Sequence, residues 1–269
     1  MTGRVTLAID ENGVADVRLV RADKMNALDT AMFDALIETG MRLKEDRAVR
    51  AVVISGDGKA FCAGLDMGNF QRTAEAGRET RPVDRLLPRT NGIANVPQYA
   101  AWVWREVPVP VIAAVHGVAF GGGFQVMLGA DMRFATPDTK LSVMEIKWGL
   151  VPDMAGTALM RHLMRDDVIR ELTYTGRIFT ADEGAALGVI TRLCADPRAE
   201  ALAMAREIAG KNPEAIRAAK RLLNAAPLAS DADALMAESR EQTAVIGKPN
   251  QVEAVMAQLQ KRAPKFTVN

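Results

Sequence analysis

Short apolar runs alternate with segments of helical periodicity through roughly the first 190 residues, and this alternation constrains the fold more than any other feature. The apolar runs are rich in Val, Ile and Ala and are bounded by turn residues, as is typical of strands. They lie at residues 5–9, 14–19, 51–55, 109–115, 132–135 and 140–143. Helical spacing is found at residues 29–44, 124–129, 155–164, 166–174 and 181–187. The pattern predicts an α/β fold built from strand–helix units.

The pattern changes after Pro197. Helical periodicity continues at residues 198–209, 213–225, 231–246 and 251–259, and no further strand pattern is found in this part of the sequence. We therefore expect two regions. Residues 1–196 form an α/β core, and residues 197–269 form a helical region for packing or assembly.

Composition excludes several function classes. The 269 residues carry a formal net charge of +1, so no basic surface for nucleic acid is expected. No apolar run approaches the roughly 20 residues that span a bilayer, and no secretory signal or membrane association is expected. Cys62 and Cys194 are too few for a disulfide framework, which favours a cytoplasmic location. His116 and His162 do not belong to a Cys/His cluster, so no metal site is expected.

Two glycine-containing turns each follow a predicted buried strand. Residues 117–123, GVAFGGG, come before a short helix, where exposed backbone N–H groups could bind a negative oxygen. The dinucleotide fingerprint G-x-G-x-x-G is not met, because Val126 stands where its last glycine belongs. The alternative is a tight turn that only permits close packing. Residues 61–66, FCAGLD, form the second turn, and together the two turns could direct two N–H groups at one oxygen.

Four motifs carry a resemblance to a known family. RADKMNAL (21–28), FCAGLD (61–66), VHGVAFGGG (115–123) and QKRAPKF (260–266) occur in the order seen in crotonases, the enoyl-CoA hydratase/isomerase family. The resemblance implies a crotonase-like spiral of ββα units with a C-terminal all-helical trimerisation region. It also implies a homotrimer or a dimer of trimers. The expected ligand is an acyl-CoA thioester, which is the substrate, and no cofactor is implied.

The resemblance also assigns roles to residues. The two oxyanion-hole N–H groups belong to Leu65 and Gly122. The positions expected to contact coenzyme A are Lys24, Ala27, Ala63, Lys261 and Lys265. The two C-terminal lysines would reach a CoA phosphate, from a neighbouring subunit if the assembly requires it. The alternative is that they are solvated surface charges. The arginine-rich segment from Gly68 to Arg89 is expected to form a flap that shapes the acyl pocket.

The sequence departs from the family pattern at the expected catalytic positions. Family hydratases use two glutamates, and here the first position is Gln125, whose amide cannot exchange a proton as a carboxyl does. The second, Glu145, is present. Asp153 stands where dienoyl-CoA isomerases of the family carry an aspartate, but those enzymes also carry an aspartate at the position of Gln125, so the set matches neither subtype fully. The alternative for Asp153 is a cap for the helix that begins near Ala155.

The expected reaction is therefore enoyl-CoA or dienoyl-CoA double-bond isomerisation, with Glu145 as base and Asp153 as its partner. Two alternatives stay open at this point. One is hydration of a 2-enoyl-CoA, with Glu145 acting on a water held by Gln125. The other is an acyl-CoA-binding protein with little or no turnover, because one of two expected acids is missing.

Overall fold

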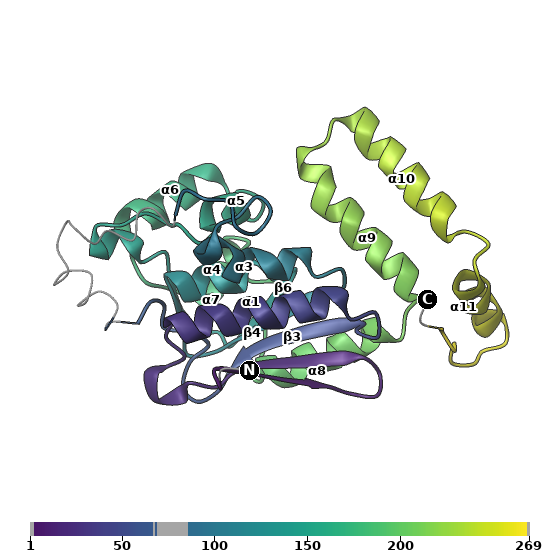
Figure 1. The fold of residues 1–269 in the computed structure, drawn as a ribbon, viewed down its shortest axis with the longest axis horizontal. Coiled ribbons are helices and arrows are strands. Elements are labelled where there is room, and N and C mark those ends of the chain that lie inside the picture. Colours follow the sequence, from purple (N-terminus) through teal and green to yellow (C-terminus); the bar gives the residue numbers. More distant parts are fainter. Residues whose placement is uncertain (1–2, 67, 69–85, 268–269) are drawn as a thin grey trace.

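The computed structural model describes residues 3–66, 68 and 86–267 (Figure 1). Most of the predicted flap, Gly68 to Arg89, lies outside the described residues. No described helix is both long enough and apolar enough to cross a membrane.

A six-stranded sheet forms the centre of the fold. Its strands, in spatial order, are β1 (Val5–Ile9), β2 (Val14–Leu19), β3 (Ala51–Gly56), β4 (Val111–Val115), β6 (Met132–Ala135) and β9 (Arg192–Leu193). β1 and β2 pair as an antiparallel hairpin, and each later strand pairs parallel to its neighbour. Parallel strands require crossover connections, and these are the helices that cover the sheet. The α/β class expected from the alternating pattern is confirmed.

The first crossover helix, α1 (Thr30–Glu45), begins where the sequence indicated. Its N-cap is Asp29, whose side chain accepts a hydrogen bond from the Met32 backbone N–H at 2.8 Å. The apolar stripe of α1, which includes Leu36 and Leu43, is fully buried. It packs against the sheet and against α3 (Val96–Glu106).

A second, three-stranded sheet lies beside the first and carries the glycine-rich turn. It consists of β5 (Val118–Phe120), β7 (Lys140–Ser142) and β8 (Phe179–Thr180). Residues 117–123 are therefore not one continuous turn, since β5 occupies their middle and pairs with β7. The chain then turns at Gly121 into α4 (Gly122–Leu128). Pairing with β7 fixes where this turn lies.

The remaining segments of the core are short. They are the single-turn helices η1 (Ala22–Lys24) and η4 (Glu145–Trp148), and the helices α5 (Gly156–Met160), α6 (Asp166–Thr175) and α7 (Ala181–Ala186). α5 ends four residues earlier than its periodicity predicts, because residues 161–163 form turns. α4 and α5 pack against each other and bring these loops together.

All four C-terminal helices expected from the sequence are present: α8 (Pro197–Ala209), α9 (Pro213–Ala225), α10 (Asp231–Val245) and α11 (Pro249–Leu259). α8 packs on the central sheet, where its buried Ala201 and Ala205 allow close approach to Val53 and Ile112. α9 and α10 run side by side and extend away from the sheet, followed by α11 (Figure 1). The division after residue 196 stays a prediction, and α8 packs with the core.

One buried lysine connects α9 to the core. Lys220 Nζ donates to the backbone oxygens of Val109 and Trp104, at 2.9 and 3.3 Å, and lies 2.7 Å from Asp131 Oδ2. The same oxygen accepts from the Val111 N–H at 2.7 Å. This cluster ties the start of β4 to the helix that leads into the projecting region.

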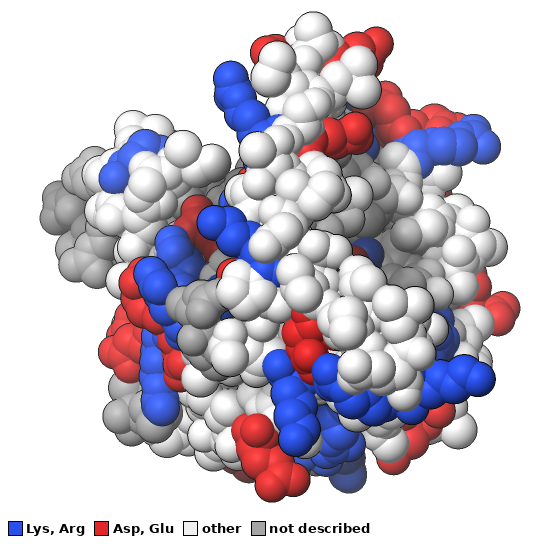
Figure 2. Space-filling view, turned by 90° about the vertical axis from the view of Figure 1, so that its right-hand side faces the viewer, with Lys and Arg blue, Asp and Glu red and all other residues white. Residues whose placement is uncertain are grey.

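The projecting helices leave large apolar side chains exposed: Leu223, Leu228, Leu235, Met236, Val252, Val255, Met256 and Leu259. Figure 2 looks onto this end of the molecule, where uncharged residues make up much of the face. Large exposed apolar patches on folded chains are typical of interaction surfaces.

Candidate active site

In the turn at residues 63–66, the Leu65 N–H takes no part in the backbone hydrogen bonds that its neighbours form. Leu28 and Leu65 form a parallel bridge in which the Leu28 N–H donates to Gly64 O at 2.8 Å and the Asp66 N–H donates to Leu28 O at 3.1 Å. These two hydrogen bonds involve Gly64 and Asp66, the residues on either side of Leu65, and do not involve the Leu65 N–H. Gly64 has φ +89°, a conformation that favours glycine.

The turn at residues 121–123 carries a second N–H, that of Gly122. Gly122 is the first residue of α4, so no preceding helical turn accepts its N–H. A Cβ on Gly64 would lie 2.7 Å from Phe120 O and 3.7 Å from Gly122 N, which leaves no room between the two turns. The structure therefore packs the turn that carries Leu65 against the turn that carries Gly122, and the binding of one oxygen by both N–H groups stays a prediction.

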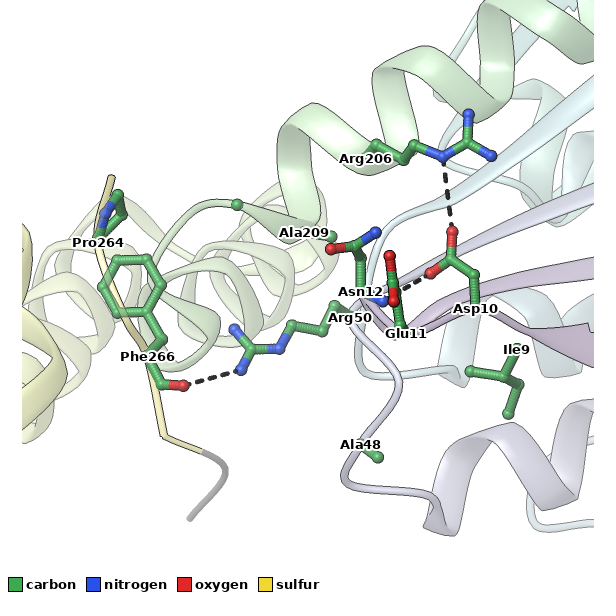
Figure 3. A pocket seen from close by; sticks show the side chains of 12 residues that line it. Ile9, Asp10, Glu11, Asn12, Ala48, Arg50, Arg206, Ala209, Pro264 and Phe266 are labelled. Carbon is green, nitrogen blue, oxygen red and sulfur yellow. Dashed lines mark hydrogen bonds and ion pairs between the residues drawn. The ribbon is translucent and has the colours of Figure 1, made fainter. Parts of the chain in front are cut away.

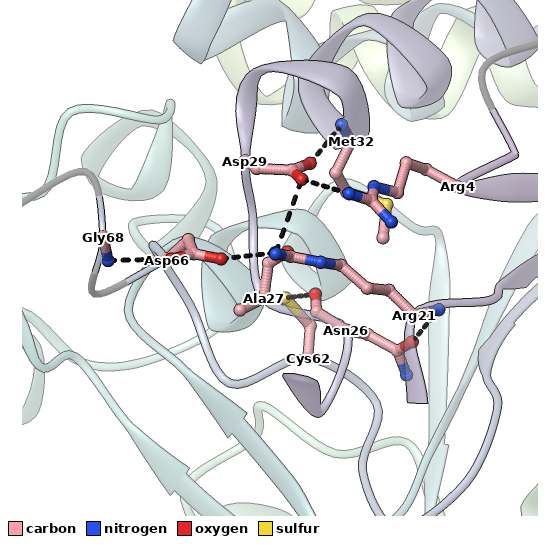
Figure 4. A network of polar contacts seen from close by, with 9 residues as sticks. All are labelled: Arg4, Arg21, Asn26, Ala27, Asp29, Met32, Cys62, Asp66 and Gly68. Carbon is pink, nitrogen blue, oxygen red and sulfur yellow. Dashed lines mark hydrogen bonds and ion pairs between the residues drawn. The ribbon is translucent and has the colours of Figure 1, made fainter. Parts of the chain in front are cut away.

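Arg21 joins the first of these turns to the segment expected to bind CoA (Figure 4). Its Nη1 lies 2.6 Å from Asp66 Oδ2 and donates to Ala27 O at 2.9 Å. The Asp66 pKa is lowered, first by the hydrogen bond from the Gly68 N–H and then by Arg21. Asp29 lies on the other side of the guanidinium, with its Oδ2 3.6 Å from Arg21 Nη2. The role of Arg21 is not apparent from the sequence, because its partners lie up to 45 residues away.

Three of the five expected CoA-binding positions lie together. Ala63 N donates to Met25 O at 2.9 Å, which places Ala63 beside the Lys24–Ala27 segment. Lys24 is exposed and Ala27 is half-buried. By contrast, Lys261 and Lys265 follow α11, which lies at the opposite end of Figure 1 from α4. One chain therefore does not bring its C-terminal lysines to this site.

Gln125 and Glu145 form the polar centre of the site. Gln125, fully buried on α4, donates from Nε2 to Glu145 Oε1 at 2.5 Å. Gln125 Oε1 accepts from the N–H groups of Met154 and Gly156, at 2.9 and 2.8 Å. Two N–H donors at the oxygen fix the orientation of the amide, so its nitrogen must face Glu145. Glu145 Oε2 is buried and has no hydrogen-bond partner among the described residues.

The surroundings favour the protonated form of Glu145. Burial raises its pKa, and the nearby charge of Asp153 raises it further, while the hydrogen bond from Gln125 lowers it in part. A Cβ on Gly121 would lie 3.4 Å from Glu145 Oε1, so this carboxyl is adjacent to the turn that leads into Gly122. A carboxylate with a raised pKa beside two backbone N–H donors is suited to proton transfer near a polarised carbonyl.

Asp153 does not cap a helix. The N-cap residue of α5 is Ala155, at φ +66°, and this cap has no side-chain hydrogen bond. The Asp153 side chain keeps contact with solvent, yet surrounding protein atoms desolvate the carboxyl and raise its pKa. The cap of α5 thus excludes the capping interpretation, and the charge of Asp153 contributes to raising the pKa of Glu145. Met154, which no sequence pattern indicates as a site residue, lies against Gly122: a Cβ on Gly122 would be 2.8 Å from Met154 Sδ.

Cys62 lies beside the site and has an unreactive thiol. Burial raises the pKa of its thiol to about 12, so the thiol stays neutral at physiological pH. Its Sγ donates to Asn26 O at 3.1 Å. Both observations support a structural role for this residue.

A cavity of about 410 Å³ lies elsewhere, between the β1–β2 turn, the end of α8 and the C-terminal segment (Figure 3). Arg206 Nε lies 3.5 Å from Asp10 Oδ2, and Arg50 Nη2 donates to Phe266 O at 3.5 Å. None of the predicted site residues, all of which the structure describes, lines this cavity. It is therefore separate from the candidate active site.

Comparison with known proteins is consistent with this geometry. The sequence model of a family described as enoyl-CoA hydratase/isomerase matches residues 10–269. The chain is 32% identical to the mitochondrial Delta(3,5)-Delta(2,4)-dienoyl-CoA isomerase of Homo sapiens, over 81% of this chain and 66% of that protein. It is 30% identical to the mitochondrial enoyl-CoA hydratase domain-containing protein 2 of Homo sapiens, over 97% of this chain and 87% of that protein.

The fold agrees as well. The crystal structure of a putative enoyl-CoA hydratase/isomerase from Mycobacterium abscessus superposes with a TM-score of 0.90 at 27% identity, covering 98% of this chain and 100% of that one. The expected crotonase fold is confirmed, and the cytoplasmic location stays a prediction. The chain belongs to the enoyl-CoA hydratase/isomerase family.

Proposed function

We propose that this protein catalyses double-bond isomerisation of an enoyl-CoA or dienoyl-CoA, with Glu145 as the base. The proposal depends mainly on the hydrogen bonds that the Gln125 side chain makes. Its Oε1 already accepts two backbone N–H groups, from Met154 and Gly156, and its Nε2 donates to Glu145, so only the second N–H of the amide is left to bind a water. One buried carboxyl, rather than two, then adjoins the two N–H donors. One carboxyl is enough to move a proton, whereas water addition by paired carboxylates requires two.

The thioester oxygen would bind between the N–H groups of Leu65 and Gly122. These donors stabilise the negative oxygen that forms when a proton leaves the neighbouring carbon, and each contributes about 3 kcal/mol in sites of this type. The glycines at positions 64 and 121 support this role, because they set the backbone of both turns before any ligand binds. The donors need no rearrangement during the reaction.

Proton transfer would follow in two steps. Glu145 removes a proton from the carbon α to the thioester, and the bonding electrons move to the thioester oxygen. The electrons then return through the conjugated system, the double bond shifts, and a proton is delivered to a vinylogous carbon by Glu145 or by Asp153. The raised pKa values of both carboxyls support both roles. No net oxidation occurs, so the reaction requires no redox cofactor.

The dienoyl-CoA isomerase named above supports this choice, at 32% identity. Hydration is the second candidate, because the unpaired Glu145 Oε2 could accept a hydrogen bond from a water. A relative at 28% identity is the methylglutaconyl-CoA hydratase of Mus musculus. An acyl-CoA-binding protein without turnover is the third candidate, and it predicts that Glu145 is dispensable.

We also propose a homotrimer or a dimer of trimers assembled through the exposed apolar side chains of α9, α10 and α11. In such an assembly Lys261 and Lys265 could reach the CoA phosphates of a neighbouring copy. The distance between α11 and α4 within one chain supports this arrangement over binding in cis (Figure 1).

The test compares three substrates on wild type, Glu145→Gln and Asp153→Asn. We expect wild type to convert 3-enoyl-CoA or 3,5-dienoyl-CoA to the product whose double bond is conjugated with the thioester carbonyl, and the change in ultraviolet absorbance follows this reaction. Glu145→Gln should lose about 100-fold or more in kcat while still binding the ester. Turnover of 2-enoyl-CoA alone, with Asp153→Asn fully active, would establish hydration instead. Binding without any turnover would establish the third candidate.

A further inference from the structure

The Gln125 side chain is bonded at both ends to different parts of the site. Its nitrogen donates to Glu145 Oε1, and its oxygen accepts from Met154 and Gly156. The residue is fully buried. A glutamine amide does not take up or release a proton at physiological pH, so its contribution cannot be proton transfer itself.

The loop that Gln125 binds is also in contact with the proposed oxyanion hole. Met154 packs its sulfur against Gly122, whose N–H is one of the two proposed donors. Gly156 has no room for a side chain, since a Cβ there would lie 2.5 Å from Gln125 Oε1. Asp153 directly precedes Met154 in this loop. A single amide therefore connects the base to the loop that carries Asp153 and covers Gly122.

We propose that Gln125 is a positioning residue that holds Glu145 and the 153–156 loop as one rigid unit, with Glu145 Oε2 left to face the substrate. This inference rests on the proposed function, because it assigns Glu145 the role of base. Binding one carboxylate oxygen prevents the carboxyl from rotating, so the proton is always taken by the other oxygen. Preorganisation of this kind matters because a misplacement of about 1 Å can reduce a rate 100-fold.

The first variant, Gln125→Leu, removes both ends of the connection at similar volume. We expect kcat to fall about 100-fold with little change in KM, because the Leu65 and Gly122 donors are not altered. The ascending limb of the kcat/KM profile should also move to higher pH. The Gln125 hydrogen bond lowers the pKa of Glu145, whereas burial and Asp153, which raise it, are unchanged. α6 packs on η4, and its acidic side chains form ion pairs at the surface. These pairs are Asp167 with Arg165, Asp166 with Arg170 and Glu171 with Arg177.

The second variant, Gln125→Glu, tests the contact with Glu145 separately from the contact with the 153–156 loop. Its carboxylate can still accept from Met154 and Gly156, but it places a second negative group against Glu145. We expect the pH limb to move upward, as for two carboxylates that share a site, while the loop stays attached. Hydrogen exchange of the Met154 and Gly156 amides should therefore match wild type in Gln125→Glu and accelerate at least about tenfold in Gln125→Leu. Asn12→Leu, at an exposed amide side chain in the turn between β1 and β2, is the matched control.

The outcomes are distinct. Gln125→Leu could lose the same fraction of activity at every pH while the Met154 and Gly156 amides exchange as in wild type. That result would show that Gln125 only fills space and would overturn the inference. If wild type turns over no CoA ester, the proposed function fails. In that case amide exchange and direct titration of the Glu145 carboxyl by NMR still decide whether Gln125 holds the unit together.

Discussion

Gly123 packs directly against the backbone of Cys62: a Cβ at position 123 would lie 2.4 Å from the Cys62 carbonyl oxygen. The obstacle is main chain, so it cannot move away as a flexible side chain could. This contact joins the two turns that carry the Leu65 and Gly122 N–H groups.

Gly123→Ala should therefore lower the free energy of unfolding by about 2 kcal/mol, the usual cost of overpacking a close contact. Urea denaturation measures it. Gly210→Ala is the control, because its Cβ would meet nothing closer than 3.4 Å and its φ is −76°. Alanine there should be neutral or slightly stabilising. Equal effects at the two positions would contradict the contact described here.

Glu145 is expected to destabilise the fold at neutral pH. Its pKa in the folded protein is raised above the ordinary value of 4.5, so the charged form is disfavoured there. Glu145→Gln should be more stable than wild type at pH 7. The difference should shrink as the pH falls through the folded pKa and vanish below about pH 4.5, where the carboxyl is neutral in both states. Thermal melts across pH measure this.

Glu253→Gln provides a control of opposite sign. Hydrogen bonds from Arg262 and the Lys265 N–H lower the pKa of Glu253 to about 2. Its contribution to stability is present above the ordinary Glu pKa and is lost as the pH falls towards 2, so this variant should be less stable than wild type at pH 7. If both variants moved in the same direction, the electrostatic account of Glu145 would be wrong.

Lys220 should stabilise the attachment of α9. Lys220→Met removes three hydrogen bonds and leaves Asp131 without its positive partner. We expect a loss of about 3 kcal/mol, at the low end for breaking a buried pair because the Asp131 side chain is 27% exposed. Adding Asp131→Asn should recover part of this loss, since no unpaired charge then remains. A double variant no more stable than Lys220→Met would contradict the pairing.

The apolar face of α10 and α11 should control assembly. By light scattering, we expect wild type at three or six times the chain mass of 29.0 kDa. Leu235→Lys and Leu259→Lys should shift it towards the monomer, because each places a charge in the proposed interface. Leu87→Lys, at an exposed leucine outside these helices, should assemble normally. A wild-type monomer would refute the proposed trimer.

The sequence by itself determined the class of fold and the composition of the site. Strand-forming runs such as Ala51–Gly56 are short and fully buried, and the stripe of Met32, Leu36 and Leu43 recurs at helical spacing. These are local properties, which propensity and periodicity record directly. Glycine at position 64 likewise indicates a turn before any partner is known. Ordered motifs then identified the family, which comparison confirmed.

Tertiary structure decided what those residues do to one another. The strand β5 within the glycine-rich segment depends on pairing with β7, 22 residues further along. Gln125, Glu145 and Met154 are held together by contacts across 20 to 29 residues, and the direction in which Gln125 points follows from two backbone N–H groups of a distant loop. Periodicity carries no information about such contacts, because hydrogen bonds between distant segments form only when the packed core has fixed their separation.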